Sequence, residues 1–289
     1  MMPEMCLTDA ALRFGGTLLN PDGCFSAVSI NSRTTNTGDL FVAIQGENVD
    51  AHSYLSNVAD KVSGAVVSRH DKTLNIPQWV VQDTTKALGD LAQLRRERFE
   101  GTVIALTGSS GKTSVKEAIS MILSQENNVH ITSGNLNNHF GVPLTLLAMD
   151  SLAEIAVIEM GASAVGEIDY LCSIAKPDVA LVNNAQTAHI EGFGSLEAIA
   201  LAKAEIYQSL RVDGTAVLNL DQPWIAQWLD IIGNRNCISF SLIDPSANLF
   251  AKNITDTGDG YFSFVLCIMP KQGEPSEERS VRLNNPGVH

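Results

Sequence analysis

The sequence predicts an α/β protein: a small N-terminal α/β domain over residues 1–99, then a domain over residues 100–289 built on a mostly parallel sheet with an antiparallel hairpin extension. From Thr102 onward, short apolar runs alternate with helical stretches, which is typical of parallel strands joined by helices. A P-loop-type glycine-rich turn follows the first of these runs and precedes a helical pattern. From Asn248 to Met269 the pattern changes to short alternating runs around TDTGDG, which indicates the hairpin.

In the N-terminal region, apolar patterns and turn residues define the elements. Asp83 supplies an N-cap for a helix that runs to Arg98, and Gly101 interrupts the pattern, so the domain boundary is placed there. The other expected elements are helices over residues 7–14 and after His52, and strands over residues 40–44, 64–68 and 78–82.

The second region contains four apolar runs that are expected to be parallel strands, at residues 103–106, 155–158, 179–182 and 215–220. The sequence stops at NNPGVH before a further helix closes this domain. We therefore expect the domain to be incomplete at its C-terminus.

The charge balance makes nucleic acid an unexpected partner. With 32 acidic against 19 basic residues, the net charge is −13, so wholesale binding to a nucleic-acid backbone is not expected. The basic run Arg95, Arg96, Arg98 is expected to be a solvated helix face. No apolar run approaches the roughly 18 to 20 residues of a membrane span, so we expect a cytoplasmic protein without membrane insertion.

The five cysteines are scattered and show no CxxC pair or zinc spacing. They are expected to be reduced, mostly buried thiols.

The stretch IALTGSSGKTSVKE predicts a phosphate-binding loop at a helix N-terminus. Gly108 and Gly111 allow successive backbone N–H groups to point at one anion, and Lys112 adds a positive charge. Thr113 can place its hydroxyl on Mg²⁺. Leu106 stands where the usual GxxxxGK[ST] pattern has its first glycine, so an ordinary glycine-serine turn is the alternative. The candidate loop residues are Gly108, Ser109, Ser110, Gly111, Lys112, Thr113 and Ser114.

Polar residues follow two further strands, and ligands of an open parallel sheet bind beyond the carboxyl ends of its strands. Glu159 follows one strand and suits Mg²⁺, which prefers oxygen ligands. Asn183, Asn184 and later His189 follow another. Glu159 could instead cap a turn, and spacing alone does not separate a functional His189 from an ordinary loop histidine.

Five segments in order resemble the Mur ligases: TGSSGKTSVKE, GNLNNHFGVPLTLL, IEMGAS, LVNNAQTAHIEGFGS and AKAEIY. The N-terminal SRTTNTGDLFVAIQGENVDAH looks like the UDP-sugar-binding segment of that family, so the resemblance spans all 289 residues. Members have three domains, and this chain ends inside the second, so the resemblance implies that the C-terminal ligase domain is absent.

The resemblance is greatest to members that join D-alanyl-D-alanine to UDP-N-acetylmuramoyl-tripeptide in peptidoglycan precursor synthesis. It implies an ATP-dependent amide ligase that takes the γ-phosphoryl of ATP onto a carboxylate, forms an acyl phosphate and lets an amine displace phosphate. The implied cofactors are ATP and Mg²⁺, the implied partners are the two substrates, and the implied oligomeric state is a monomer.

The same resemblance assigns roles to individual residues. It implies one Mg²⁺ near Thr113 and Glu159, a second near His189, and a carbamylated lysine at Lys203, for which an exposed helix lysine is the alternative. Asn138 resembles the residue that contacts the nucleotide phosphates. Residues that match the uridine-sugar segment are Ser32, Arg33, Asp50 and His52, and a surface turn is the alternative there.

Two other functions stay open. One is another Mur-type or folylpolyglutamate-type ligase, which would differ in the amino acid that it adds. The other is a non-catalytic P-loop nucleotide-binding module, which would bind nucleotide without dependence on a peptide substrate.

Overall fold

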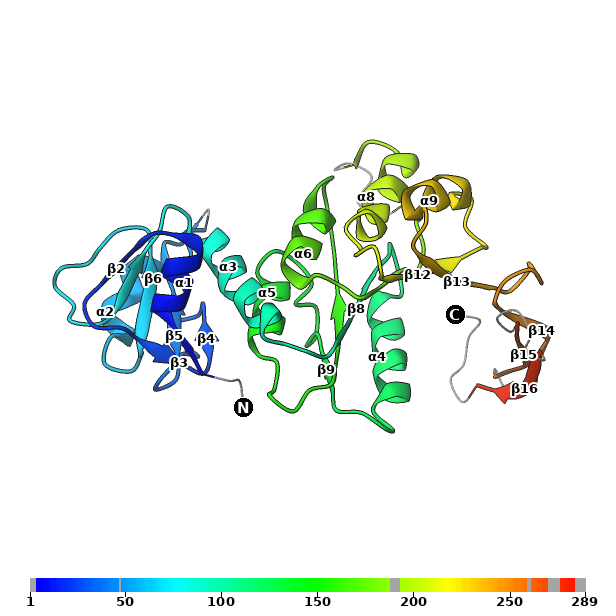
Figure 1. The fold of residues 1–289 in the computed structure, drawn as a ribbon, viewed down its shortest axis with the longest axis horizontal. Helices are drawn as coiled ribbons and strands as arrows, with labels where there is room; N and C mark the ends of the chain where they lie inside the picture. Colours follow the sequence, from blue (N-terminus) through cyan, green and yellow to red (C-terminus); the bar gives the residue numbers. More distant parts are fainter. Residues whose placement is uncertain (1–3, 47, 188–192, 259–260, 270–275, 284–289) are drawn as a thin grey trace. The chain divides into compact units, whose positions relative to one another are not determined.

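A computed structural model describes residues 4–46, 48–187, 193–258, 261–269 and 276–283 (Figure 1). The chain forms two compact units that are not contiguous in sequence. The first contains residues 1–103, 119–160 and 173–176, and the second contains residues 104–118, 161–172 and 177–289.

The N-terminal part contains a five-stranded sheet with the order β2-β7-β6-β5-β4. Strands β4 to β7 are parallel, and β2 pairs with β7 in the antiparallel sense. The three predicted strands are confirmed, each ending one or two residues earlier than expected. The strands are β2 (Thr17–Leu19), β4 (Val28–Ser29), β5 (Leu40–Val42), β6 (Gly64–Val67) and β7 (Gln78–Val80).

The predicted helices of this region are also confirmed. Asp83 caps the longest one, because its carboxylate accepts hydrogen bonds from the backbone N–H groups of Thr85 and Lys86 at 2.7 and 3.0 Å. The apolar side chains of Phe41, Val58 and Val67 meet in the core between sheet and helices. The helices are α1 (Leu7–Phe14), the 3₁₀ turn η1 (Ala51–Tyr54), α2 (Leu55–Val58) and α3 (Thr84–Glu97).

A nine-stranded sheet follows, with the order β16-β15-β14-β13-β12-β11-β8-β10-β9. The pair β9–β10 is parallel, as are the successive pairs from β8 through β11, β12 and β13 to β14, whereas β14, β15 and β16 form an antiparallel extension, as the sequence pattern indicates. The strands are β8 (Thr102–Thr107), β9 (Val129–Ile131), β10 (Ile155–Glu159), β11 (Val179–Val182), β12 (Thr215–Asn219), β13 (Asn236–Ser241), β14 (Leu249–Asp256), β15 (Phe262–Ile268) and β16 (Glu277–Arg282).

Helices connect the strands from β8 to β13, and Figure 1 labels these helices. The described helices are α4 (Lys112–Leu123), α5 (Gly141–Leu147), α6 (Glu167–Ala175), α8 (Leu196–Gln208) and α9 (Ile225–Ile232). Within the described residues, no helix combines the length and the apolarity that crossing a membrane requires.

The prediction of a solvated arginine face on α3 is wrong for two of its three residues. Arg95 and Arg96 are buried, at 2% and 8% exposure. Their guanidinium groups donate to backbone carbonyls: Arg95 to Met149 at 3.0 Å, and Arg96 to Ala175 and Lys176 at 2.7 and 2.9 Å. A planar cation with several donors can satisfy carbonyl groups at the end of another element, which a charge pattern along one helix does not reveal.

The expectation of five reduced thiols is also wrong in part. Cys6 and Cys24 form a disulfide, because the short strands β1 (Met5–Cys6) and β3 (Cys24–Phe25) pair antiparallel with these two residues opposite each other. Cys172 and Cys267 are buried free thiols, and Cys237 is an exposed one.

Candidate active site

The predicted phosphate-binding loop is the turn between β8 and α4. Strand β8 ends at Thr107 and helix α4 begins at Lys112, so residues 108–111 lie beyond the carboxyl end of a parallel strand. Gly111 has a φ of +70°, which favours glycine, and a Cβ on Gly108 would lie 3.1 Å from the Cβ of Asn183. A side chain at residue 111 would strain the backbone, and one at residue 108 would crowd Asn183.

Asn183 and Asn184 hold this loop from the end of the neighbouring strand β11. The side-chain oxygen of Asn184 accepts hydrogen bonds from the backbone N–H groups of Ser109 and Ser110 at 3.1 and 3.0 Å. Both asparagine amides donate to the carbonyl of Ser110, at 2.9 Å from Asn183 and 3.1 Å from Asn184. The loops at the ends of β8 and β11 are thus joined, as expected for neighbouring parallel strands, and Asn184 acquires a role that the sequence pattern alone did not assign.

The two loop serines use their hydroxyls within the same structure. The Ser109 hydroxyl donates to the carbonyl of Gln186 at 2.9 Å, and the Ser110 hydroxyl donates to the side-chain oxygen of Gln186 at 3.0 Å. The Lys112 ammonium donates to the carbonyl of Gly108 at 2.9 Å, which folds the cation back over the loop. At the first turn of α4, Thr113 and Ser114 are exposed.

Lys203 is buried on α8, where the positive charge of Lys112 acts on it. Its exposure is only 4%, which excludes the alternative of an exposed helix lysine. Burial, and then the charge of Lys112, lower the pKa of Lys203 from 10.5 to about 8. Lys203 therefore has a larger neutral fraction near pH 8 than an ordinary lysine.

Glu159 ends strand β10 and is almost fully buried, at 1% exposure. Its carboxylate accepts a hydrogen bond from the side-chain amide of Asn137 at 2.8 Å, and its backbone N–H donates to the hydroxyl of Thr132 at 2.9 Å. The exposed Asn138 accepts from the N–H groups of Phe140 and Gly141 at 3.1 and 2.9 Å, at the start of α5. His189, the remaining predicted metal ligand, lies outside the described residues.

In the N-terminal part, Asp50 and His52 belong to one hydrogen-bonded network. Asp50 contacts the Nδ1 atom of His52 at 2.6 Å and the guanidinium of Arg69 at 2.6 Å. The Nε2 atom of His52 accepts from the backbone N–H of Ser68 at 2.8 Å, and the histidine side chain is only 4% exposed. Arg69 contributes most to lowering the pKa of Asp50 to about 2.

Ser32 and Arg33 lie in a turn after β4, where the N–H of Arg33 donates to the side chain of Asn31 at 3.0 Å. The Arg33 side chain is exposed. This geometry is that of a surface turn, the alternative considered for this segment. It also leaves the Arg33 guanidinium accessible to an anion.

Two polar hollows lie beyond the strand ends of the five-stranded sheet. One, of about 470 Å³, is lined by Gln45, Gly46, Ser68, Gln82, Asp83, Thr84 and Thr85. The other, of about 400 Å³, is lined by His52, Ser53, Leu55, Arg69, His70, Asp71 and Lys72. Ser68 is the last residue of the predicted strand at residues 64–68 and Arg69 directly follows it, so an inspection of the strand ends could have identified both from the sequence.

Comparisons with known proteins agree with this geometry. Residues 106–289 match the family described as Mur ligase middle domain. The chain is 42% identical over 245 residues to the UDP-N-acetylmuramoyl-tripeptide--D-alanyl-D-alanine ligase of Escherichia coli (strain K12). This alignment covers 85% of this chain and 54% of that protein. It thus spans about half the length of the curated relatives it matches.

Solved structures of two MurF ligases share the fold of this chain. The crystal structure of MurF from Acinetobacter baumannii has a TM-score of 0.89 at 35% identity, covering 99% of this chain and 62% of that chain. MurF ligase from Thermotoga maritima, in complex with ADP, has a TM-score of 0.76 at 29% identity, covering 89% of this chain and 57% of that chain.

Proposed function

The chain belongs to the Mur ligase family, and from that membership we propose that it is part of an ATP-dependent, ADP-forming ligase that joins D-alanyl-D-alanine to UDP-N-acetylmuramoyl-tripeptide. The observation that carries the proposal is the loop at residues 108–111. It presents backbone N–H groups and a helix N-terminus beyond a parallel strand, with Lys112 folded over it and Lys203 buried near that charge. The names of the relatives suggest the substrates.

The proposed chemistry explains why such a loop is needed. A carboxylate is a poor electrophile, so transfer of the γ-phosphoryl of ATP gives it a good leaving group, and the amine of the dipeptide then displaces phosphate. The protein must hold two anions together and offset their charge. In this proposal the loop N–H groups and Lys112 bind the phosphates, and Asn138 contacts them from its own loop.

The donor set of the described residues fits Mg²⁺. The Thr113 hydroxyl and the buried Glu159 carboxylate are the hard oxygen ligands that this ion prefers, and we propose that they hold one ion, with His189 near a second. A bound Mg²⁺ would offset charge on the β- and γ-phosphates. Lys203, once carbamylated, would supply a further carboxylate to a metal ion or its water, and its lowered pKa supports that modification.

For the UDP-sugar we propose a site at the carboxyl edge of the five-stranded sheet, formed by the loops that carry Ser32, Arg33, Asp50 and His52. Because Asp50 and His52 are engaged with Arg69 and Ser68, they would act by positioning these neighbours. Arg69 and Arg33 are then the exposed cations available to a diphosphate. The two hollows at this edge support the placement.

The proposed domain arrangement is a UDP-sugar-binding domain at residues 1–99 and an ATP-binding domain at residues 100–289, followed by a C-terminal ligase domain. The greater length of the matched relatives supports the third domain. We propose that the full-length protein is a cytoplasmic monomer.

The experiment is an ADP-release assay on the full-length protein. We expect release that requires both UDP-N-acetylmuramoyl-tripeptide and D-alanyl-D-alanine, and Lys112→Ala should abolish it while UDP-sugar binding persists. Lys86→Ala, which removes an exposed lysine paired with Asp90, is the matched control. Activity with a single amino acid would favour another ligase of the family, and nucleotide binding without any peptide dependence would favour a binding module. The 289-residue chain alone should turn over slowly or not at all, because closure of a third domain is expected to complete such a site.

A further inference from the structure

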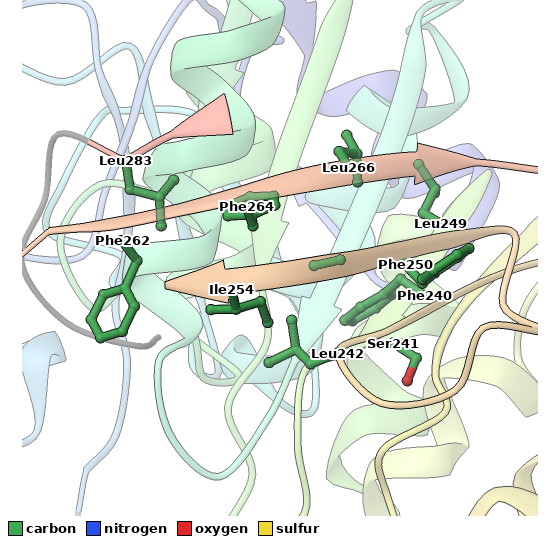
Figure 2. Close-up of a pocket in the computed structure, with 11 residues that line it drawn as sticks. Phe240, Ser241, Leu242, Leu249, Phe250, Ile254, Phe262, Phe264, Leu266 and Leu283 are labelled. Carbon is green, nitrogen blue, oxygen red and sulfur yellow. The ribbon is translucent and has the colours of Figure 1, made fainter. Parts of the chain in front are cut away.

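The antiparallel extension carries an apolar groove whose walls come from β13, β14 and β15 (Figure 2). On β15, Phe262, Phe264 and Leu266 alternate along the strand, so their side chains share one face. Across the ladder, Ala251 of β14 lies opposite Leu266, and Val281 of β16 lies opposite Phe264. Apolar residues of three strands therefore meet on this face, and Arg279 of β16, opposite Leu266, brings a charge to its edge.

An irregularity in β14 adds to the groove. The register shifts between Lys252 and Thr255, and Asn253 adopts a φ of +55°. This bulge re-aims the strand, so that Ile254 joins the groove. Ile254 remains 39% exposed, and Leu242, which also lines the groove, is 54% exposed. Apolar residues that are exposed next to an apolar groove are typical of an interaction surface or a ligand-binding groove.

The lining excludes a polar small molecule as the natural occupant. The groove has a volume of about 320 Å³, and Ser241 is the polar residue among those that line it. The Ser241 hydroxyl is already bonded to Asp221, and it accepts from the N–H groups of Ile243 and Asp244 at 2.9 and 2.7 Å. A ligand site needs polar groups that fix orientation, whereas apolar side chains of a polypeptide need only matching shape.

The course of the chain after β16 favours the continuation of the same polypeptide as the occupant of the groove. Leu283 lines the groove, and its N–H donates to the carbonyl of Phe262 at 2.9 Å, so the chain leaves β16 at the groove itself. Figure 2 shows Leu283 beside Phe262. The matched structure of MurF from Acinetobacter baumannii covers 99% of this chain with 62% of its own length, so more than a third of that protein has no counterpart here.

From these observations we propose that the polypeptide following residue 289 in the full-length protein packs apolar side chains into this groove. The inference rests on the proposed function in one respect, namely that the protein continues into a further domain. A second copy is a poorer occupant, because the edge strand β16 has the sequence EERSVR, and charged edge strands oppose pairing between sheets.

The test measures the accessibility of the groove in the full-length protein and in this 289-residue chain. Both carry Cys237→Ser, which removes the exposed free thiol, and Phe264→Cys, and the rate of reaction with a maleimide is followed. We expect the full-length protein to react about tenfold more slowly, or slower still, because its thiol becomes accessible only on local opening. Ser280→Cys is the control, since Ser280 is exposed and pairs with Val265 on the other face, and its rate should be the same in both lengths.

Equal rates for Phe264→Cys in the two lengths would overturn the proposal. So would protection that appears in the 289-residue chain and rises with its concentration, because that result identifies a second copy. If Phe264→Cys disturbs folding, Leu242→Cys tests the same groove from its exposed side. The labelling requires no nucleotide or peptide substrate. An inactive full-length protein that protects residue 264 would therefore contradict the proposed function alone, and an active one that leaves it reactive would contradict this inference alone.

Discussion

The side-chain oxygen of Asn184 accepts a hydrogen bond from the backbone N–H of Ser110 across 3.0 Å. The same oxygen accepts from the N–H of Ser109, so one amide dipole occupies two of the loop donors that a phosphate would use. A phosphate must compete with Asn184 for these groups. Asn184, the second residue after β11, thereby helps to set the affinity of the loop for anions.

Asn184→Asp should weaken nucleotide binding strongly. A carboxylate accepts the same two hydrogen bonds more tightly than an amide and also repels a triphosphate, so a cost of about 2 kcal/mol, or roughly 30-fold in Kd, is expected. Calorimetric titration of the protein with a non-hydrolysable ATP analogue measures it. Asn57→Asp, on an exposed side chain of α2, makes the same change in net charge and should leave Kd unchanged. Equal affinity in the two variants would show that Asn184 does not compete with the nucleotide.

Lys203 should make activity depend on bicarbonate and pH. Carbamylation requires the neutral amine, and the pKa of Lys203 is lowered from 10.5 to about 8, mainly by burial. The neutral fraction therefore rises as pH increases through about 8 instead of about 10.5. In the full-length protein, ADP release should increase with added bicarbonate between pH 7 and about 9, and ¹³C-labelled bicarbonate should give a carbamate signal.

The control is Lys203→Arg, which keeps a positive charge but does not form the carbamate. It should lose most of the activity and all of the bicarbonate response. A bicarbonate response that survives in Lys203→Arg would assign the effect to another group.

The sequence locates the phosphate-binding loop well because its determinants are local. Gly111 needs a left-handed backbone, Lys112 begins an amphipathic helix, and both features occur within a few adjacent residues. Four strands of the parallel sheet, β8, β10, β11 and β12, are predictable for the same reason, since each of them is a compact apolar run. Two strands were not predicted: β9 has only three residues and lies at the edge of the sheet, and β13, with the sequence NCISFS, lacks a continuous apolar run.

What the sequence does not predict depends on contacts between distant segments. Arg96 meets the carbonyls of residues 175 and 176, about 80 positions away, and Cys6 meets Cys24 only because two short strands pair. The network of Asp50, His52 and Arg69 also depends on a distant contact. The sequence suggested Asp50 and His52 as substrate-binding residues, whereas Arg69, which contacts Asp50, follows a strand further along the chain.

Asp50→Asn should lower stability in a way that depends on pH. Arg69 first, and His52 after it, lower the pKa of Asp50 from 3.8 to about 2, so the ionised carboxylate stabilises the folded state. For a depressed carboxyl pKa, that stabilisation is present above the unfolded value of 3.8 and is lost as pH falls through about 2. The free energy of unfolding of the wild type should therefore exceed that of Asp50→Asn by about 1–2 kcal/mol at pH 7. This difference should disappear as the pH falls from 4 to about 2.

Thermal unfolding at several pH values measures this difference. Asp60→Asn, at an exposed position after α2, is the matched control and should differ little from wild type at any of them. A gap for Asp50→Asn that stays constant down to pH 2 would show that lost packing, and not the ionised carboxylate, causes the effect.

Arg96→Lys should destabilise the protein far more than Arg98→Lys, although the two arginines are two residues apart on one helix. The guanidinium of Arg96 donates to Ala175 at 2.7 Å, to Lys176 at 2.9 Å and to Phe99 at 3.0 Å, and the side chain is buried. A lysine ammonium lacks the planar fork, so buried carbonyls lose their donors and about 2–4 kcal/mol of unfolding free energy should be lost. Arg98 forms an exposed ion pair with Asp9, and exposed pairs contribute about 1 kcal/mol or less. Urea unfolding of both variants decides the matter: similar midpoints would mean that the three carbonyl contacts of Arg96 do not stabilise the fold.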